Sequence, residues 1–105
     1  ASLRFYSALY IGGMGSRETN FYNALAVRMG FAEAAAQVQE LFLAGDREAA
    51  MKAVPDELAD GIALCGPLDR IKDRMQLWRD SPVKTLLIGG VRNPEHLKAL
   101  AALVR

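Results

Sequence analysis

Val83-Lys84-Thr85-Leu86-Leu87-Ile88, followed by Gly89 and Gly90, is the stretch that decides the fold class of this 105-residue chain. Residues 85–88 run on without polar alternation, a pattern typical of a parallel β-strand that is buried on both faces. No other segment predicts a strand convincingly. Because an unpaired buried backbone group costs about 1–3 kcal/mol, this strand needs a neighbour that the rest of the sequence does not supply. Either two chains share the strand, or the chain is part of a larger parallel sheet.

A helix is predicted on each side of this strand, and each helix has a clear start signal. Proline stands at the first position, where no hydrogen-bonded N–H is needed, in Gly66-Pro67-Leu68 and in Asn93-Pro94-Glu95. The two predicted helices cover residues 68–80 and 93–105. Their apolar faces are Leu68, Ile71, Met75 and Trp78 on the first, and Leu97, Leu100, Ala101 and Val104 on the second. Helix, strand, glycine turn and helix make one period of an α/β barrel or of an open α/β sheet.

The preceding residues predict further helices, so the fold class is mainly α with one β-strand. Apolar residues at three- and four-residue spacing predict helices near residues 2–11, 21–29, 31–44, 47–54 and 55–62. Gly12-Gly13-Met14-Gly15 is expected to end the first helix, and Ser16 or Thr19 to cap the second. Gly30 and Gly45 are expected to end the next two, and Asp46 to cap the fourth. The helical spacing of Tyr6, Tyr10 and Tyr22 favours packing inside the protein.

Composition indicates an ordinary globular chain without a nucleic-acid or membrane partner. Apolar residues make up 51% of the chain and charged residues 24%, and 13 basic against 12 acidic residues leave a formal charge of +1. Because no block of like charges occurs, nucleic acid and anionic membranes are poor candidates as partners. No stretch approaches the roughly 20 apolar residues of a membrane span. Cys65 is the only cysteine, which suits a reducing compartment, so the cytoplasm is the expected location.

Four motifs, taken in order, resemble the C-terminal third of a luciferase-like monooxygenase. They are residues 12–18 (GGMGSRE) with 20–23 (NFYN), residues 54–58 (VPDEL), residues 66–71 (GPLDRI) and residues 85–89 (TLLIG). The likeness covers nearly the whole chain. More narrowly, the chain is similar to the deazaflavin-dependent oxidoreductases of that superfamily, of the methylenetetrahydromethanopterin reductase type.

This resemblance implies that residues 1–105 are a single C-terminal portion of a (β/α)8 TIM barrel, holding its last strand and flanking helices. The strand would then pair with the first and seventh strands, which lie outside this chain. The parent protein would transfer hydride between a small organic substrate and coenzyme F420, a deazaflavin, with FMN as the second choice. Catalytic groups would lie mostly on earlier strands, so no catalytic residue is assigned here. This portion alone is expected to be inactive.

Two glycine-rich stretches hold the candidate cofactor-binding residues. The first consists of Gly12, Gly13, Met14, Gly15, Ser16 and Arg17. Its glycines let backbone N–H groups approach an anion, and its hydroxyl and guanidinium would complete a phosphate cradle. The alternative role is a flexible joint between helices, which sequence physics alone favours. The second stretch, Gly89 with Gly90, fits close approach of a cofactor and a tight turn after a strand equally well.

The other chemically distinctive residues favour structural roles. His96 lies in the first turn of a predicted helix without a visible partner, so we expect it to be solvated. Cys65 lies in a mostly apolar run and is expected to be a small buried filler. Asp56 and Glu57 suit the positive end of a helix dipole. No metal site is expected, because further ligands are not near them.

A second hypothesis belongs to a different class of protein. It is a small helical interaction domain that associates with itself, pairs its strand across a two-fold axis and has no catalytic activity. For the chain as a portion of a barrel we expect exposed apolar surface and self-association, because helices that cover a barrel keep their apolar faces when the barrel is absent.

Overall fold

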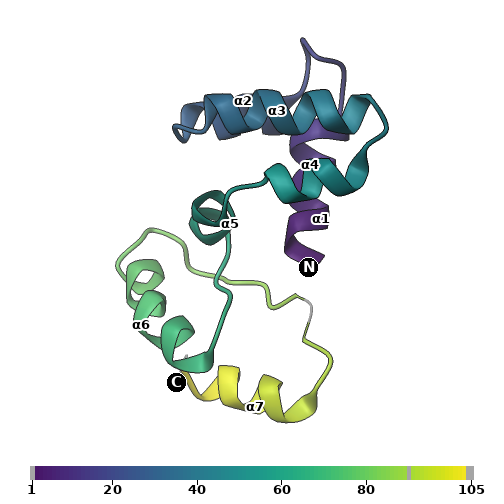
Figure 1. The fold of residues 1–105 in the computed structure, drawn as a ribbon. Helices are drawn as coiled ribbons and strands as arrows, with labels where there is room; N and C mark the ends of the chain where they lie inside the picture. Colours follow the sequence, from purple (N-terminus) through teal and green to yellow (C-terminus); the bar gives the residue numbers. More distant parts are fainter. Residues whose placement is uncertain (1, 90, 104–105) are drawn as a thin grey trace. The chain divides into compact units, whose positions relative to one another are not determined.

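The computed structural model describes residues 2–89 and 91–103, which fall into two compact units divided between Ala63 and Leu64 (Figure 1). The first unit is helical throughout its regular parts. Its elements are α1 (Ser2–Ala8), the π-helix η1 (Leu9–Gly13), α2 (Phe21–Arg28), α3 (Ala32–Leu43), α4 (Arg47–Ala53) and α5 (Asp56–Ile62). The mainly α character expected from the sequence is confirmed in this unit.

Helix α3 lies at the centre of the first unit, where it contacts η1, α2 and α4. The core around it is built mostly from small side chains, which let the helices approach one another closely. Its buried members are Ala8, Ile11, Ala26, Ala35, Val38, Ala50, Val54 and Leu58. All of them belong to this unit, so residues 2–63 have a hydrophobic core of their own.

Arg4 ties the two ends of the first unit together. Its guanidinium donates to the carbonyl of Val54 at 2.8 Å, where α4 has just ended, and forms an ion pair with Asp56 at the start of α5. The side chain thereby satisfies a carbonyl that α4 leaves without an intrahelical partner. Helix α1 is in this way joined to the connection between α4 and α5.

Gly12 and Gly13 belong to η1 and do not simply end it. A Cβ added to Gly12 would lie 2.6 Å from the Cβ of Phe42 and 3.1 Å from the carbonyl oxygen of Val38. A Cβ added to Gly13 would lie 2.3 Å from the ring of Phe42. These two glycines are therefore required by the close approach of η1 to α3. The expected break in the helix comes after Gly13, where the loop begins.

Most of the boundary signals read from the sequence are confirmed. Gly30 and Gly45 have φ values of +94° and +90°, as glycine at a helix end requires, and Asp46 accepts from the N–H of Ala49 at 3.0 Å. The expectation that Ser16 or Thr19 caps the second helix is wrong. Asn20 is the capping residue of α2, and its carboxamide oxygen accepts from the N–H of Asn23 at 2.9 Å.

The second unit contains α6 (Leu68–Arg79) and α7 (Pro94–Leu103), with irregular backbone between them. The strand predicted over residues 83–88 is wrong for this structure: residues 83–89 carry no regular secondary structure. The physical reason is the missing neighbour, because a strand exists only where its backbone groups bond to a second strand. No barrel is present among the described residues. Gly90 and Val104 lie outside the described residues.

Replacing Gly12 by alanine tests the contact between η1 and α3. Alanine ordinarily stabilises a helix by about 1 kcal/mol relative to glycine. Here its methyl group would overlap Phe42 and the backbone of Val38, so we expect Gly12→Ala to lower the free energy of unfolding by about 1–3 kcal/mol. Urea unfolding followed by circular dichroism measures the change.

Gly61→Ala is the matched control for this substitution. Gly61 lies in α5, and a Cβ there meets only the flexible end of Met29 at 3.4 Å. The control should leave the stability unchanged or raise it. Equal behaviour of the two variants would contradict a steric role for Gly12.

Candidate functional site

The candidate loop, residues 14–19, is an exposed segment between two buried anchors. Ile11 and Gly12 are buried before it, Asn20 is buried after it, and every residue from Met14 to Thr19 is exposed. The loop follows the end of η1 and leads directly into α2. Its ends are therefore fixed by the core while its middle faces solvent.

The carboxamides of Asn20 and Asn23 form the anchor on the α2 side. Asn20 donates to the carbonyls of Tyr10 and Ile11 at 3.1 and 2.9 Å, and Asn23 donates to those of Ile11 and Ala35 at 3.1 and 2.9 Å. The carbonyls of Tyr10 and Ile11 belong to the short helix η1, whose end leaves carbonyls without intrahelical partners, and the two amides donate to them. The two side chains, called here the asparagine clamp, join η1, α2 and α3 at one point.

Within the loop, Gly15 adopts a backbone conformation that favours glycine. Its φ is +142°, and an added Cβ would lie 2.7 Å from the carbonyl oxygen of Thr19. This turn brings the hydroxyls of Ser16 and Thr19 to 2.7 Å from each other, and the N–H of Thr19 donates to the carbonyl of Ser16 at 3.3 Å. The loop is thus a compact turn with its own hydrogen bonds.

The loop presents groups that suit an anion. Arg17 is exposed and forms no ion pair within the described part of the chain, so its guanidinium is available to a ligand. The hydroxyls of Ser16 and Thr19 lie beside it in sequence. Six residues were predicted here as cofactor-binding. Gly12 and Gly13 pack against Phe42, whereas Met14, Gly15, Ser16 and Arg17 lie at the surface. Whether any of the six binds a cofactor stays a prediction.

The second predicted stretch belongs to the second unit. Gly89 is exposed, and a Cβ added to it would meet nothing within 4 Å, so no close contact in this structure requires glycine there. Its partner in that prediction, Gly90, is outside the described residues. A role for Gly89 in cofactor binding stays a prediction.

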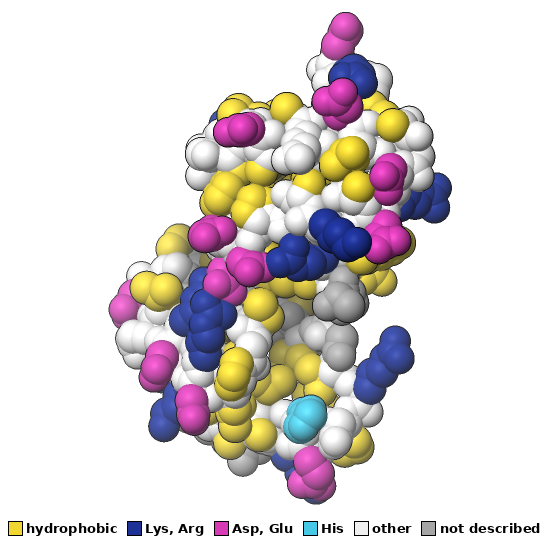
Figure 2. Space-filling model, in the orientation of Figure 1, with side chains coloured by type: hydrophobic (Ala, Val, Ile, Leu, Met, Phe, Trp, Pro, Cys, Tyr) yellow, Lys and Arg dark blue, Asp and Glu magenta, His cyan; other side chains and the backbone are white. Residues whose placement is uncertain are grey.

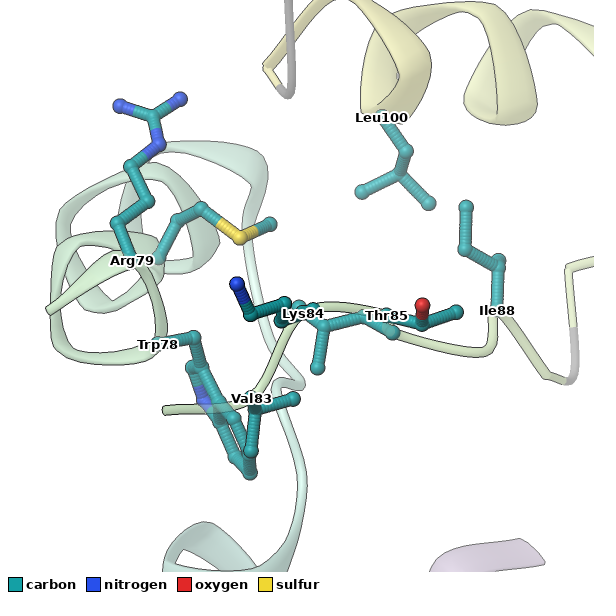
Figure 3. A pocket seen from close by; sticks show the side chains of 9 residues that line it. Trp78, Arg79, Val83, Lys84, Thr85, Ile88 and Leu100 are labelled. Atoms are coloured by element: carbon teal, nitrogen blue, oxygen red, sulfur yellow. The ribbon is translucent and has the colours of Figure 1, made fainter. Parts of the chain in front are cut away.

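A hollow of about 410 Å³ lies between α6, residues 83–88 and α7 (Figure 3). Ile88 and Leu100 face one another across it, and Trp78 lies beside Val83. The guanidinium of Arg79 points out of the hollow and donates to the carbonyl of Leu103. The remaining lining is mainly apolar, with Lys84 and Thr85 as its polar members.

The remaining candidate residues carry no site among the described residues. His96 is exposed in the first turn of α7, and Cys65 is half-buried. No cluster of metal-ligating side chains occurs in the ranges 2–89 and 91–103, and no helix there is long and apolar enough to cross a bilayer. On the face drawn in Figure 2, basic and acidic side chains are interspersed.

Sequence reasoning missed the asparagine clamp and the place of Phe42. A signal for the clamp was present, because asparagine is a preferred N-cap residue and Asn20 directly precedes the apolar pattern of α2. Nothing in the sequence pairs Phe42 with Gly12 and Gly13, since that contact joins residues about 30 positions apart through the tertiary fold.

Comparisons of the sequence relate this chain to known proteins. Residues 1–85 match the family model described as luciferase-like monooxygenase. The chain is 36% identical over 104 residues to a Mycobacterium tuberculosis protein named "Putative coenzyme F420-dependent oxidoreductase". The match covers 99% of this chain and 30% of that protein, so the chain spans about a third of the length of its relative. No solved structure matches.

Replacing Asn20 by alanine tests the asparagine clamp. The variant loses the cap of α2 and leaves the carbonyl of Tyr10 without its donor. A lost cap costs about 1 kcal/mol, and a buried unsatisfied group about 1–3 kcal/mol more. We expect the free energy of unfolding to fall by about 2–4 kcal/mol in urea titrations.

Asp46→Ala is the control, because Asp46 caps α4 through a single exposed hydrogen bond to Ala49. It should cost about 1 kcal/mol. If Asn20→Ala lowered the free energy of unfolding no more than Asp46→Ala does, the hydrogen bonds from Asn20 to Tyr10 and Ile11 would contribute nothing to stability.

Proposed function

The chain belongs to the luciferase-like monooxygenase family, and from this membership we propose that it is part of an oxidoreductase that uses coenzyme F420. In this proposal the deazaflavin exchanges hydride with a small organic substrate. The observation that carries the cofactor assignment is the 36% identity, across 99% of this chain, to a protein named as an F420-dependent oxidoreductase. FMN is the second choice, because the family as a whole is described as monooxygenases.

The role proposed for the loop at residues 14–19 is to hold an anionic group of the cofactor. A phosphate needs N–H or O–H donors and a cation at one exposed place. Ser16, Arg17 and Thr19 bring these groups together on a turn that Gly15 shapes. The asparagine clamp would keep the loop in position. The cofactor supplies the hydride chemistry, while the chain binds and orients it.

For residues 83–88 we propose pairing as the last strand of a (β/α)8 barrel completed by polypeptide outside this chain. Two features support this role. Leu87 is 95% exposed and Ile88 is 52% exposed, although both are apolar. The segment also joins two helices, as a barrel strand does. Catalytic groups would then come from other strands, and these 105 residues alone would be inactive. The proposed location of the protein is the cytoplasm, a reducing compartment that a single cysteine, Cys65, suits.

Cofactor titration tests the proposed function. Difference absorption spectra of a family-length protein carrying these residues, titrated with coenzyme F420 and with FMN, should show saturable binding of F420. Saturation by FMN alone would move the assignment to the second choice. Absence of a spectral change with both cofactors would contradict the function.

Arg17→Ala in the same protein tests the loop separately from the function. Loss of a charge-assisted hydrogen bond of about 1.5 kcal/mol should raise the F420 dissociation constant about tenfold. Lys52→Ala is the control, because Lys52 is an exposed cation of the same unit that pairs with Glu48. Unchanged affinity in Arg17→Ala would remove the loop from the cofactor site and leave the proposed function standing.

A further inference from the structure

The helix that begins at Ser2 changes its winding before it ends. Residues 2–8 form α1, and residues 9–13 continue it directly as the π-helix η1. Ala8, where the two meet, has helical φ and ψ values of −64° and −41°. A π-helix joins carbonyls and N–H groups that are five residues apart, whereas an α-helix joins groups four residues apart. Because π-turns are rare, a contact with the rest of the unit has to stabilise this one.

Phe42 is one contact of η1, and it explains only the packing. Its side chain occupies the space beside Gly12 and Gly13. Phenylalanine has no hydrogen-bonding group in its side chain, so it does not decide which carbonyl of η1 bonds to which N–H. The two glycines weaken any helix to which they belong, because glycine loses more backbone freedom on folding than other residues. The form of the turn is therefore decided by polar groups.

The asparagine clamp supplies polar contacts of the required kind. In an α-helix that continued through η1, the carbonyls of Tyr10 and Ile11 would accept from the N–H groups of residues 14 and 15. Here both carbonyls accept from the carboxamide of Asn20, at 3.1 and 2.9 Å, and Ile11 also accepts from Asn23 at 3.1 Å. The clamp therefore takes the two acceptors that an α-helical last turn would use.

The asparagine clamp is made entirely of residues of this chain. Asn20 is 5% exposed, and its carboxamide oxygen accepts from the N–H of Asn23, so the two clamp residues also fix each other. Asn23 further donates to the carbonyl of Ala35 in α3 at 2.9 Å. The amides are thus held in place by α2 and α3 while they bond to η1, and no group from outside the chain takes part.

We propose that the asparagine clamp is a register latch, which holds residues 9–13 in the π form and thereby sets the position of the loop at residues 14–19. A π-turn contains one residue more than an α-turn between its bonded groups. When the clamp is lost, η1 rewinds as an α-helix, and everything that follows it shifts by one residue. Ser16 and Arg17 are displaced by this shift. The latch concerns the conformation of the loop and does not rest on cofactor binding.

Couplings through hydrogen bonds in the NMR spectrum of the 105-residue chain test the latch, because each coupling identifies the carbonyl to which an N–H bonds. The unmodified chain should show couplings across five residues in η1. Asn20→Ser keeps an oxygen that caps α2 but removes both donations to Tyr10 and Ile11. Asn23→Leu removes the remaining donation to Ile11. In each variant the couplings across five residues should be lost, couplings across four residues should replace them, and the amide shifts of residues 14–19 should change.

Asp46→Ser is the matched control, because it makes a similar change at the N-cap of α4, whose printed bond goes to Ala49 and not to η1. It should leave the couplings of η1 and the amide shifts of residues 14–19 unchanged. Couplings across four residues within α3 report in every variant that the unit is folded. Couplings across four residues in η1 of the unmodified chain would overturn the proposal without any variant. So would couplings across five residues that persist in a folded Asn20→Ser or Asn23→Leu chain.

Discussion

The carbonyl groups at the end of η1 set the main constraint on the first unit. A helix that ends inside a folded domain leaves carbonyls without partners, and burying them unpaired costs more than most single contacts contribute. Asn20 and Asn23 meet this requirement for Tyr10 and Ile11, and Asn23 also bonds to Ala35 of α3. One pair of side chains thereby fixes η1 against two helices. The exposed loop between η1 and α2 takes its position from this arrangement.

The glycines of the stretch 12–15 have structural reasons of two kinds. Gly12 and Gly13 have a packing reason to be glycine, since Phe42 occupies the space of their missing side chains. Gly15 has a conformational reason. Ser16 bonds to Thr19 within the turn, whereas Arg17 has no such contact among the described residues, and both are exposed on a turn held at its two ends. A role of these two residues in cofactor binding stays a prediction.

The sequence predicted the parts of the fold that depend on local signals. Gly30, Gly45 and Asp46 were assigned to helix ends correctly because each acts on backbone groups next to it. Contacts between distant residues were out of reach, including Phe42 against Gly12. The strand over 83–88 was expected from its apolar run, but strand pairing needs partners that no local pattern provides. Tyr6, Tyr10 and Tyr22 were expected to pack inside the protein and are exposed instead, because helical spacing does not tell a buried apolar face from an exposed one.

The central claim of this account is that residues 2–63 form a unit with its own hydrophobic core, whereas residues 83–89 have no regular secondary structure. Native-state hydrogen exchange on the 105-residue chain, read by residue, tests it most directly. Amides of α3 should exchange slowest and those of η1 and the first turn of α2 nearly as slowly, while residues 83–89 should exchange close to the rate of an unfolded peptide. Protection of residues 83–89 equal to that of α3, or loss of protection in η1, would contradict the account.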